Sequence, residues 1–339
     1  AFQTKSISGT GGCKSAYYCD ITCQRANWPK HKPECKKIQN KKDAVKEDAE
    51  QKAQLAKEEA EATCGPRGED ILEVVCFICR CGGKLVRNCG CRGSSGWFHV
   101  DCVAEWALRY EDRPTRRDMT RFLRWIECMN CNQDFQGVVR LALTRRMWCR
   151  HAVSEFSEQQ RDASYYLGDA LISNGLHDEA AAVLEKCLML TRSAFGVDDF
   201  WTQQIELQLG DALRGTDPSR AIALQRRVHA VRLRTLGHDH EHTLFAGEVL
   251  ARTLMNNGGA AEAEPIYRAS LAGFRSIYGR DSHESLSCVV NYAACLLHQE
   301  KFAEAHVLIE ENLPRAVQTL GKDHLTTRKL EQNLLFCNR

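Results

Sequence analysis

Cysteine and histidine residues occur in closely spaced pairs between residues 76 and 131. The pairs are Cys76 and Cys79, Cys89 and Cys91, His99 and Cys102, and Cys128 and Cys131. Zinc prefers four tetrahedral nitrogen and sulfur ligands, and a two-residue spacing lets one turn present two ligands to one ion. Four such pairs predict two structural zinc sites. Because the protein fills every coordination position in such sites, no catalytic residue and no activated water are expected.

The distribution of cysteines favours metal sites over disulfides. Thirteen of the 18 cysteines lie between Cys13 and Cys131, and the start of the chain shows no signal peptide. Dense cysteine clusters in a reducing compartment usually bind metal, although disulfides or core thiols are the alternative. We therefore expect a cytoplasmic protein, with the nucleus as the alternative. The isolated later cysteines are expected to be core residues: Cys187, Cys288, Cys295 and Cys337.

The paired segment resembles the RING-CH zinc finger, through the strings CFIC, CGCRGSSGWFHVDCVAEW and CMNC. This resemblance implies a small, zinc-stabilised α+β domain over residues 69–140. It assigns Cys76, Cys79, His99 and Cys102 to one zinc ion, and it assigns Cys89, Cys91, Cys128 and Cys131 to the other. Cys81 competes as a ligand but fits the family pattern less well.

RING-CH fingers are ubiquitin ligases that hold a charged conjugating enzyme without forming a covalent intermediate. The resemblance places the enzyme contact at Ile78 and Trp106, although Trp106 could instead pack under the zinc loop. Two departures weaken the assignment. Met129-Asn130 replaces the proline common between the last two cysteines, and Asn132 replaces a cationic residue that often follows them.

Residues 1–37 resemble the second half of a MYND finger, through the string GCKSAYYCDITCQRANWPKHKPECKK. The resemblance implies the zinc ligands Cys13, Cys19, Cys23, His31 and Cys35, and a peptide groove at Gln24 and Trp28. A further ligand is expected at residue 10, which is Thr10. Because the chain opens with Ala1, we expect the natural N-terminus and the remaining ligands to lie upstream. The alternative is a stub without fixed structure.

Glycines recur at a constant interval in the second half of the chain. Gly196, Gly237, Gly279 and Gly321 are 41, 42 and 42 residues apart, and a polar cluster follows each one. This pattern predicts a helix that ends at a left-handed glycine and a second helix capped by the polar residues. Small residues recur in phase, which would let paired helices approach closely: Gly168, Gly210, Ala251 and Ala293 in the first helices, and Ala180, Ala221, Ala263 and Ala305 in the second.

This region, 161–339, resembles the tetratricopeptide repeat in the longer form of kinesin light chains, with a C-terminal cap helix. The resembling strings are LGDALISNGLHDEA, LARTLMNNGGAAEA and YAACLLHQEKFAEA. We therefore expect a mostly α fold, in which a tetratricopeptide-repeat α-solenoid follows the two fingers. Its groove would bind a protein or peptide substrate at Arg214, Arg252, Met255 and Leu297.

Two segments connect these parts. Residues 38–68 consist mostly of Lys, Glu, Asp, Ala and Gln, which predicts a charged, solvated helical linker without an apolar stripe. Residues 141–160 are expected to be a connecting helix.

Composition narrows the class of function. The net charge is +2, hydrophobic residues make up 43%, and no apolar stretch is long enough to span a bilayer. Neither nucleic acid nor a membrane is expected as a partner. The sequence favours a soluble RING-type ubiquitin ligase whose repeats recruit substrate. The alternative is a non-catalytic zinc-finger and repeat adaptor that mediates protein–protein interactions.

Overall fold

The computed structural model describes residues 43–44, 46–63, 74–89, 91, 96–111, 122–151, 156–322 and 324–337. The chain divides into two compact units, residues 1–163 and residues 164–339, and α5 (Glu158–Ser173) crosses the boundary. Within the described ranges, no helix has the length and apolar character needed to cross a membrane.

The first unit contains three short helices around a small aromatic core. They are α2 (Val100–Glu111), α3 (Leu123–Ile126) and α4 (Gly137–His151), and each contacts the other two. Phe98 is fully buried at the centre, with ring contacts to Phe77 at 6.1 Å and Phe135 at 5.2 Å between centroids. In the described part of this unit, β structure is limited to two isolated antiparallel bridges, Val86 with Phe98 and Glu127 with Asp134.

Helix α4 changes the boundary predicted between the finger and a connecting helix. The prediction ended the finger at residue 140, whereas α4 runs from Gly137 to His151 without interruption. Val139, Leu143 and Met147 are fully buried. Because α4 contacts both α2 and α3, it forms part of the core of the finger unit.

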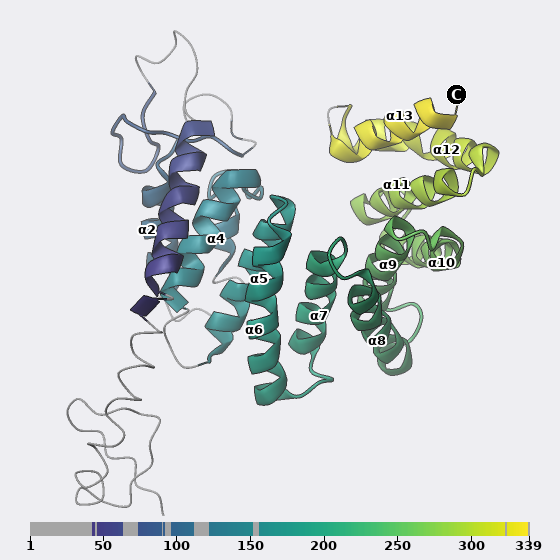
Figure 1. Ribbon diagram of the computed structural model, residues 1–339. Coiled ribbons are helices and arrows are strands. Elements are labelled where there is room, and N and C mark those ends of the chain that lie inside the picture. Colours follow the sequence, from purple (N-terminus) through teal and green to yellow (C-terminus); the bar gives the residue numbers. More distant parts are fainter. Residues whose placement is uncertain are drawn as a thin grey trace, which may run out of the picture. The chain divides into compact units, whose positions relative to one another are not determined.

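The charged segment before the finger is helical over residues 46–63, but the prediction that it is fully solvated is wrong (Figure 1). Ala49, Ala53, Ala56 and Ala60 are buried, with exposed fractions of 7% or less. Their spacing of four, three and four residues places them on one helix face. Alanine methyl groups thus provide an apolar stripe that a search for large hydrophobic residues overlooks.

Ion pairs join this helix to the finger. Lys57 Nζ donates to Asp101 Oδ2 of α2 across 2.5 Å, and Arg146 of α4 pairs with the other oxygen of the same carboxylate. Lys84 lies 3.8 Å from Glu61. The predicted pair of Lys57 with Glu61 is also present, at 3.9 Å. The helix therefore packs on the finger within the first unit.

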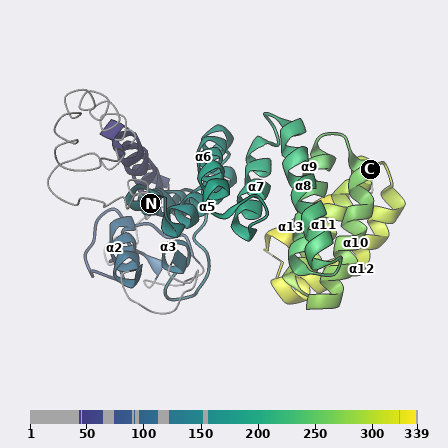
Figure 2. The same cartoon turned by 90° about the horizontal axis from the view of Figure 1, so that it is seen from below.

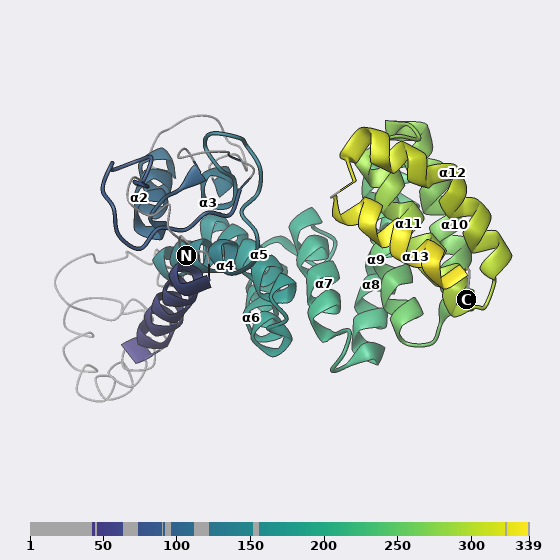
Figure 3. The ribbon, with the colours of Figure 1, turned by 90° about the horizontal axis from the view of Figure 1, so that it is seen from above.

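The second unit is a stack of antiparallel helix pairs, as predicted (Figures 1 and 2). After α5, its helices are α6 (His177–Phe195), α7 (Phe200–Leu213), α8 (Pro218–Leu236), α9 (Glu241–Asn256), α10 (Ala260–Tyr278), α11 (His283–His298), α12 (Phe302–Leu320) and α13 (Leu325–Cys337). Helix α13 packs against both α11 and α12 (Figure 3). Its outer surface is not purely polar, because Leu325, Leu335 and Phe336 are exposed.

The recurring glycines end the second helix of each pair. Gly196 has φ 93° and ψ 173°, and the other three have φ between 88° and 91°. The positive φ agrees with the prediction, but the extended ψ differs from the predicted left-handed helical conformation. This backbone region is essentially restricted to glycine, which explains the recurrence of that residue type.

The small residues lie where paired helices cross, as predicted. A Cβ atom on Gly168 would meet Leu184 Cδ2 at 2.7 Å, and one on Gly210 would meet Gln225 Nε2 at 2.6 Å. The six alanines at the recurring positions are fully buried. The helices of a pair therefore approach too closely for larger residues at these points.

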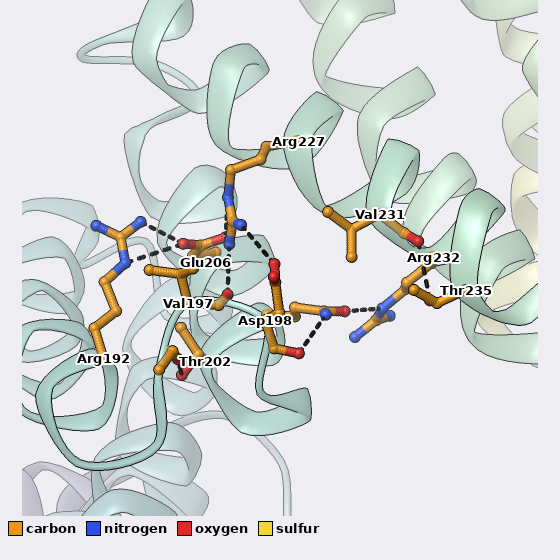
Figure 4. Close-up of polar contacts among 11 residues, drawn as sticks. Arg192, Val197, Asp198, Thr202, Glu206, Arg227, Val231, Arg232 and Thr235 are labelled. Carbon is orange, nitrogen blue, oxygen red and sulfur yellow. Dashed lines mark hydrogen bonds and ion pairs between the residues drawn. The ribbon is translucent and has the colours of Figure 1, made fainter.

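A buried carboxylate joins three helices of the second unit (Figure 4). Glu206 of α7 is fully buried and is paired with Arg192 of α6 and Arg227 of α8. Arg227 also donates to the Val197 carbonyl oxygen at 3.1 Å, in the loop between α6 and α7. These contacts connect one repeat to the next through a single acidic side chain.

Candidate functional site

The structure brings the thiol and imidazole groups of the first unit together in two clusters. One contains Cys76, Cys79, His99 and Cys102, and the other contains Cys89, Cys91, Cys128 and Cys131. In each cluster the ligand atoms lie within 4.8 Å of one another. The first and third sequence pairs thus meet in one cluster, and the second and fourth pairs meet in the other. In this interleaved arrangement, each cluster combines ligands that are more than 20 residues apart in sequence.

His99 contributes its Nδ1 atom to the first cluster. That atom lies 3.4 Å from Cys79 Sγ and 3.6 Å from Cys102 Sγ. The opposite ring nitrogen, Nε2, lies 3.2 Å from the carbonyl oxygen of Gly82. Donation from Nε2 to this carbonyl leaves a lone pair on Nδ1 that faces the sulfurs, which is the arrangement expected of a metal-ligating histidine.

Two identical turns present the first and last cysteine pairs. Cys76 N donates to Cys81 O and Arg80 N donates to Cys76 O, each at 2.9 Å. In the last pair, Cys128 N donates to Gln133 O at 2.9 Å and Asn132 N donates to Cys128 O at 2.8 Å. One turn thus aims two sulfurs at the same point.

This turn gives a physical account of Asn132. The residue after the second cysteine has a positive φ in both turns, 64° at Arg80 and 52° at Asn132. Asparagine tolerates the left-handed conformation better than most residues with a side chain. The departure from a cationic residue at position 132 therefore matches the backbone conformation of the turn.

The donor set of both clusters is compatible with zinc. Tetrahedral zinc with Zn–S bonds of about 2.3 Å places neighbouring sulfurs about 3.8 Å apart, and Cys91 Sγ lies 3.7 Å from Cys128 Sγ. Burial raises the pKa of Cys89 to about 11 and that of Cys102 to about 12. A cation at the centre would oppose this effect by stabilising the thiolates.

Cys81 lies outside both clusters. Its side chain is exposed, and its Sγ donates a long hydrogen bond of 3.5 Å to the Cys79 carbonyl oxygen. Its backbone carbonyl accepts the hydrogen bond from Cys76 N that closes the turn. Cys81 therefore shapes the first turn through its backbone.

The two residues predicted to contact a conjugating enzyme are both half-buried. Ile78 lies within the first cysteine turn, and Trp106 lies on α2. The guanidinium of Arg124 lies 5.1 Å from the centroid of the Trp106 ring, in a cation–π contact. The sequence analysis missed Arg124, because only the approach of α3 to α2 places it over the tryptophan.

The first helices of successive repeats present a half-exposed strip of side chains. We call this strip the first-helix face; it consists of Gln204, Gln208, Asp211, Phe245, Glu248, Arg252, Ser287, Asn291 and Ala294. The spacing of three and four residues within each helix puts them on one side. Because α7 contacts α9 and α9 contacts α11, the strip continues across three repeats.

Hydrogen bonds between neighbouring helices hold this face together. Arg252 donates to Asp211 Oδ2 at 2.5 Å, and Asn291 donates to Glu248 Oε1 at 2.6 Å. Gln208 Nε2 donates to the Tyr165 carbonyl oxygen of α5 at 3.0 Å. The charges of the face therefore pair with one another to a large extent.

The four predicted peptide contacts are less available than expected. Arg252 pairs with Asp211, and the Arg214 guanidinium lies 4.0 Å from the same carboxylate. Met255 and Leu297 are partly buried against the hydrophobic core of the last repeats. Residues 41 positions apart in sequence therefore neutralise each other on this face, and binding at the four positions stays a prediction.

The N-terminal ligands Cys13, Cys19, Cys23, His31 and Cys35, together with Gln24 and Trp28, lie outside the described residues. In a comparison with known families, residues 9–35 match the MYND finger. Residues 248–284 match the tetratricopeptide repeat.

The individual curated relatives match only a short part of the chain. The chain is 55% identical over 33 residues to the N-lysine methyltransferase SMYD2-A of Danio rerio and 48% identical over 33 residues to SMYD2 of Rattus norvegicus. Each match spans 10% of this chain and 8% of the relative.

Two solved structures align with more than half of this chain. Repeats of a candidate kinesin light chain from Podosopora anserina are 18% identical and cover 65% of this chain and 96% of that chain, with a TM-score of 0.44. BtubC (BKLC) from P. vanneervenii is 16% identical over 57% of this chain and 80% of that chain, with a TM-score of 0.46.

Proposed function

We propose that this protein is a zinc-stabilised adaptor that binds protein partners, mainly through the first-helix face of its repeats. The observation that carries the proposal is the continuity of this face over α7, α9 and α11, with Phe245 49% exposed at its centre. Repeat arrays expose such extended surfaces to bind other proteins. The match to the MYND finger, a type of protein-interaction module, supports the same class of function.

A matched pair of variants tests this adaptor function. Phe245→Asp places a charge at the centre of the first-helix face, whereas Val307→Asp places one on α12, where Val307 is 66% exposed. We expect Phe245→Asp to reduce the recovery of cross-linked partners from cells and Val307→Asp to leave it unchanged. Both variants are first shown to be folded by circular dichroism. Equal recovery of partners with both would then mean that partners do not bind the first-helix face.

The second candidate function is that of a RING-type ubiquitin ligase. The observation that favours it is the interleaved pairing of Cys76, Cys79, His99 and Cys102 apart from Cys89, Cys91, Cys128 and Cys131. We propose these residues as the ligands of two zinc ions, and the resemblance of their spacing to RING-CH fingers extends the proposal to transfer. In that case Ile78 and Trp106 contact the conjugating enzyme, and Arg124 holds the Trp106 ring in place.

Autoubiquitination of the full chain with a panel of conjugating enzymes separates the two functions. A ligase gives ubiquitin conjugates that Ile78→Ala and Trp106→Ala reduce strongly without a change in zinc content, since an aromatic interface anchor contributes about 2 kcal/mol or more. Absence of conjugates with every enzyme tested leaves the adaptor function alone.

A further inference from the structure

In the second unit, α7, α9, α11 and α13 begin with side-chain caps of two classes. Asp199 caps α7 through Oδ2, which accepts from Trp201 N and Thr202 N, and Ser282 caps α11 through Oγ. Histidine takes this place in the other two helices. His240 Nδ1 accepts from His242 N at 3.1 Å, and His324 Nδ1 accepts from Thr326 N at 3.2 Å.

A histidine cap depends on protonation in a way that the other caps do not. Nδ1 can accept an N–H hydrogen bond only while it carries no proton, because both ring nitrogens of a protonated imidazole are donors. Histidine changes charge between about pH 5 and pH 8, whereas a hydroxyl and an ordinary carboxylate keep their state over that range. Protonation of Nδ1 therefore removes the acceptor of a histidine cap, whereas the caps of α7 and α11 do not use an imidazole.

Several other titratable groups surround His240. Its own segment carries His238, Asp239, Glu241 and His242, and the imidazole rings of His240 and His242 lie 5.2 Å apart. Helix α8 contributes Arg232, which is 1% exposed and donates to the carbonyl oxygen of His242 at 3.0 Å.

The other hydrogen bonds of Arg232 are with neutral oxygens, and its guanidinium also lies over the Phe200 ring at 5.6 Å from the centroid. Its Nε donates to Gln203 Oε1 and its Nη2 to Gln204 Oε1. The salt bridges found among the described residues do not include this guanidinium, whereas His242 has a carboxylate, Glu241, at 3.9 Å. Arg232 disfavours a positive charge on His242, and Glu241 offsets part of that effect.

The histidines at this junction resist protonation, although Glu241, whose Oε1 lies 3.9 Å from His242 Nε2, acts in the opposite direction. His229 of α8 lies against α9, where a Cβ atom on Gly247 would meet its Nε2 at 3.1 Å. Burial lowers the pKa of His229, and His238 adds to the effect. Burial also lowers the pKa of His242, with Arg232 as the next cause. From α10, Tyr278 donates its hydroxyl hydrogen bond to Glu241, which leaves that carboxylate shared.

In the described part of the chain, fewer titratable groups are found around His324 than around His240. The ring of His283, at the start of α11, meets the His324 ring at 5.7 Å between centroids, and Lys322 lies two positions before it. Protonation of either histidine adds positive charge beside the other.

We propose that the histidine-capped starts of α9 and α13 form a pH-sensitive joint, which loosens on acidification while the starts of α7 and α11 stay closed. At the start of α9, the direction of the pH effect on stability follows from the lowered pKa values of His229 and His242. The unfolded chain takes up these protons more readily than the folded chain, so their contribution to stability is complete above a pH of about 6.5 and is lost as the pH falls below it. The joint would make partner binding to the second and third repeats sensitive to pH.

Hydrogen exchange of the full chain tests the joint, with α7 and α11 as internal controls. Protection factors of the first-turn amides are measured at pH 7.5 and pH 5.5, after correction for intrinsic exchange. We expect those of α9 and α13 to fall about fivefold or more at pH 5.5, the size expected for a lost cap, and those of α7 and α11 to stay constant.

The double variant His240→Asn/His324→Asn provides the matched control, since asparagine caps a helix and does not titrate. It should remove the difference between the two kinds of helix while keeping the melting temperature at pH 7.5. Equal responses of all four helices in the wild type would overturn the proposal, as would a response that persists in the double variant. If the double variant melts early, His240→Asp/His324→Asp, which copies the cap of α7, provides the same comparison.

Discussion

The guanidinium of Arg252 in α9 donates a hydrogen bond across 2.5 Å to the carboxylate of Asp211 in α7. The side chains are 32% and 18% exposed, and Asp211 raises the pKa of Arg252 against the opposing effect of burial. The pair links the first helices of consecutive repeats. Arg252, predicted to contact a peptide, therefore also connects two repeats.

Removal of this link should therefore destabilise the repeat unit. We expect Arg252→Met, which keeps the aliphatic stem, to lower the free energy of unfolding by about 1–3 kcal/mol, because Asp211 loses its hydrogen-bond donor in a half-buried site. Urea denaturation measures the change. The control is Arg226→Met, since Arg226 and Glu262 are 55% and 54% exposed and such pairs contribute about 1 kcal/mol or less. If Arg252→Met lowered the free energy of unfolding no more than Arg226→Met does, the pair of Arg252 and Asp211 would contribute no more than an exposed ion pair.

The carboxylate of Glu206 should also stabilise the repeat unit. Its side chain is 0% exposed and compensates two arginines, so Glu206→Ala leaves Arg192 and Arg227 without a common partner. We expect a loss of about 1–3 kcal/mol in the free energy of unfolding, because two partly exposed guanidinium groups lose a charged acceptor. Glu185→Ala, which breaks an exposed pair with Arg220, should cost about 1 kcal/mol or less. Thermal denaturation of the two variants side by side would refute this ranking if their melting temperatures fell equally.

Zinc content should follow the two clusters residue by residue. Native mass spectrometry of the full chain should show that Cys79→Ser loses one zinc ion relative to the wild type, because Cys79 belongs to the first cluster. Cys81→Ser should keep the wild-type count, since that thiol lies outside both clusters. Chelation should unfold the finger unit, because structural zinc contributes about 10–16 kcal/mol of apparent free energy in small fingers. Loss of an ion from Cys81→Ser would require a different ligand set.

The alanine stripe of the helix 46–63 should be needed for its docking on the finger. Ala60 is 0% exposed, whereas Ala62 two positions later is exposed. We expect Ala60→Glu to detach the helix and open it to limited proteolysis, because a buried unpaired carboxylate is costly and the stripe has no room for it. Ala62→Glu adds the same charge to the solvent side and should leave the cleavage pattern unchanged. Identical patterns from both variants would show that the ion pairs of Asp101 suffice for docking.

Much of this protein is determined by local sequence alone. Ligand types and spacing define the cysteine pairs of the finger, because a two-residue interval suits one turn of backbone. The helix pairs follow in the same way from glycines 41 and 42 residues apart, since only glycine readily adopts the backbone conformation at those helix ends. Both signals depend on the conformation of a few neighbouring residues, which sequence records directly.

The tertiary structure decided which side chains remain available for binding. It buried the alanines of the helix 46–63, placed Arg124 over Trp106 and paired Arg252 with Asp211. It also made His240 and His324 the caps of α9 and α13. An exposed charge and a paired charge look the same in a sequence, because the partner of Arg252 is 41 residues away and is brought near only when consecutive repeats stack.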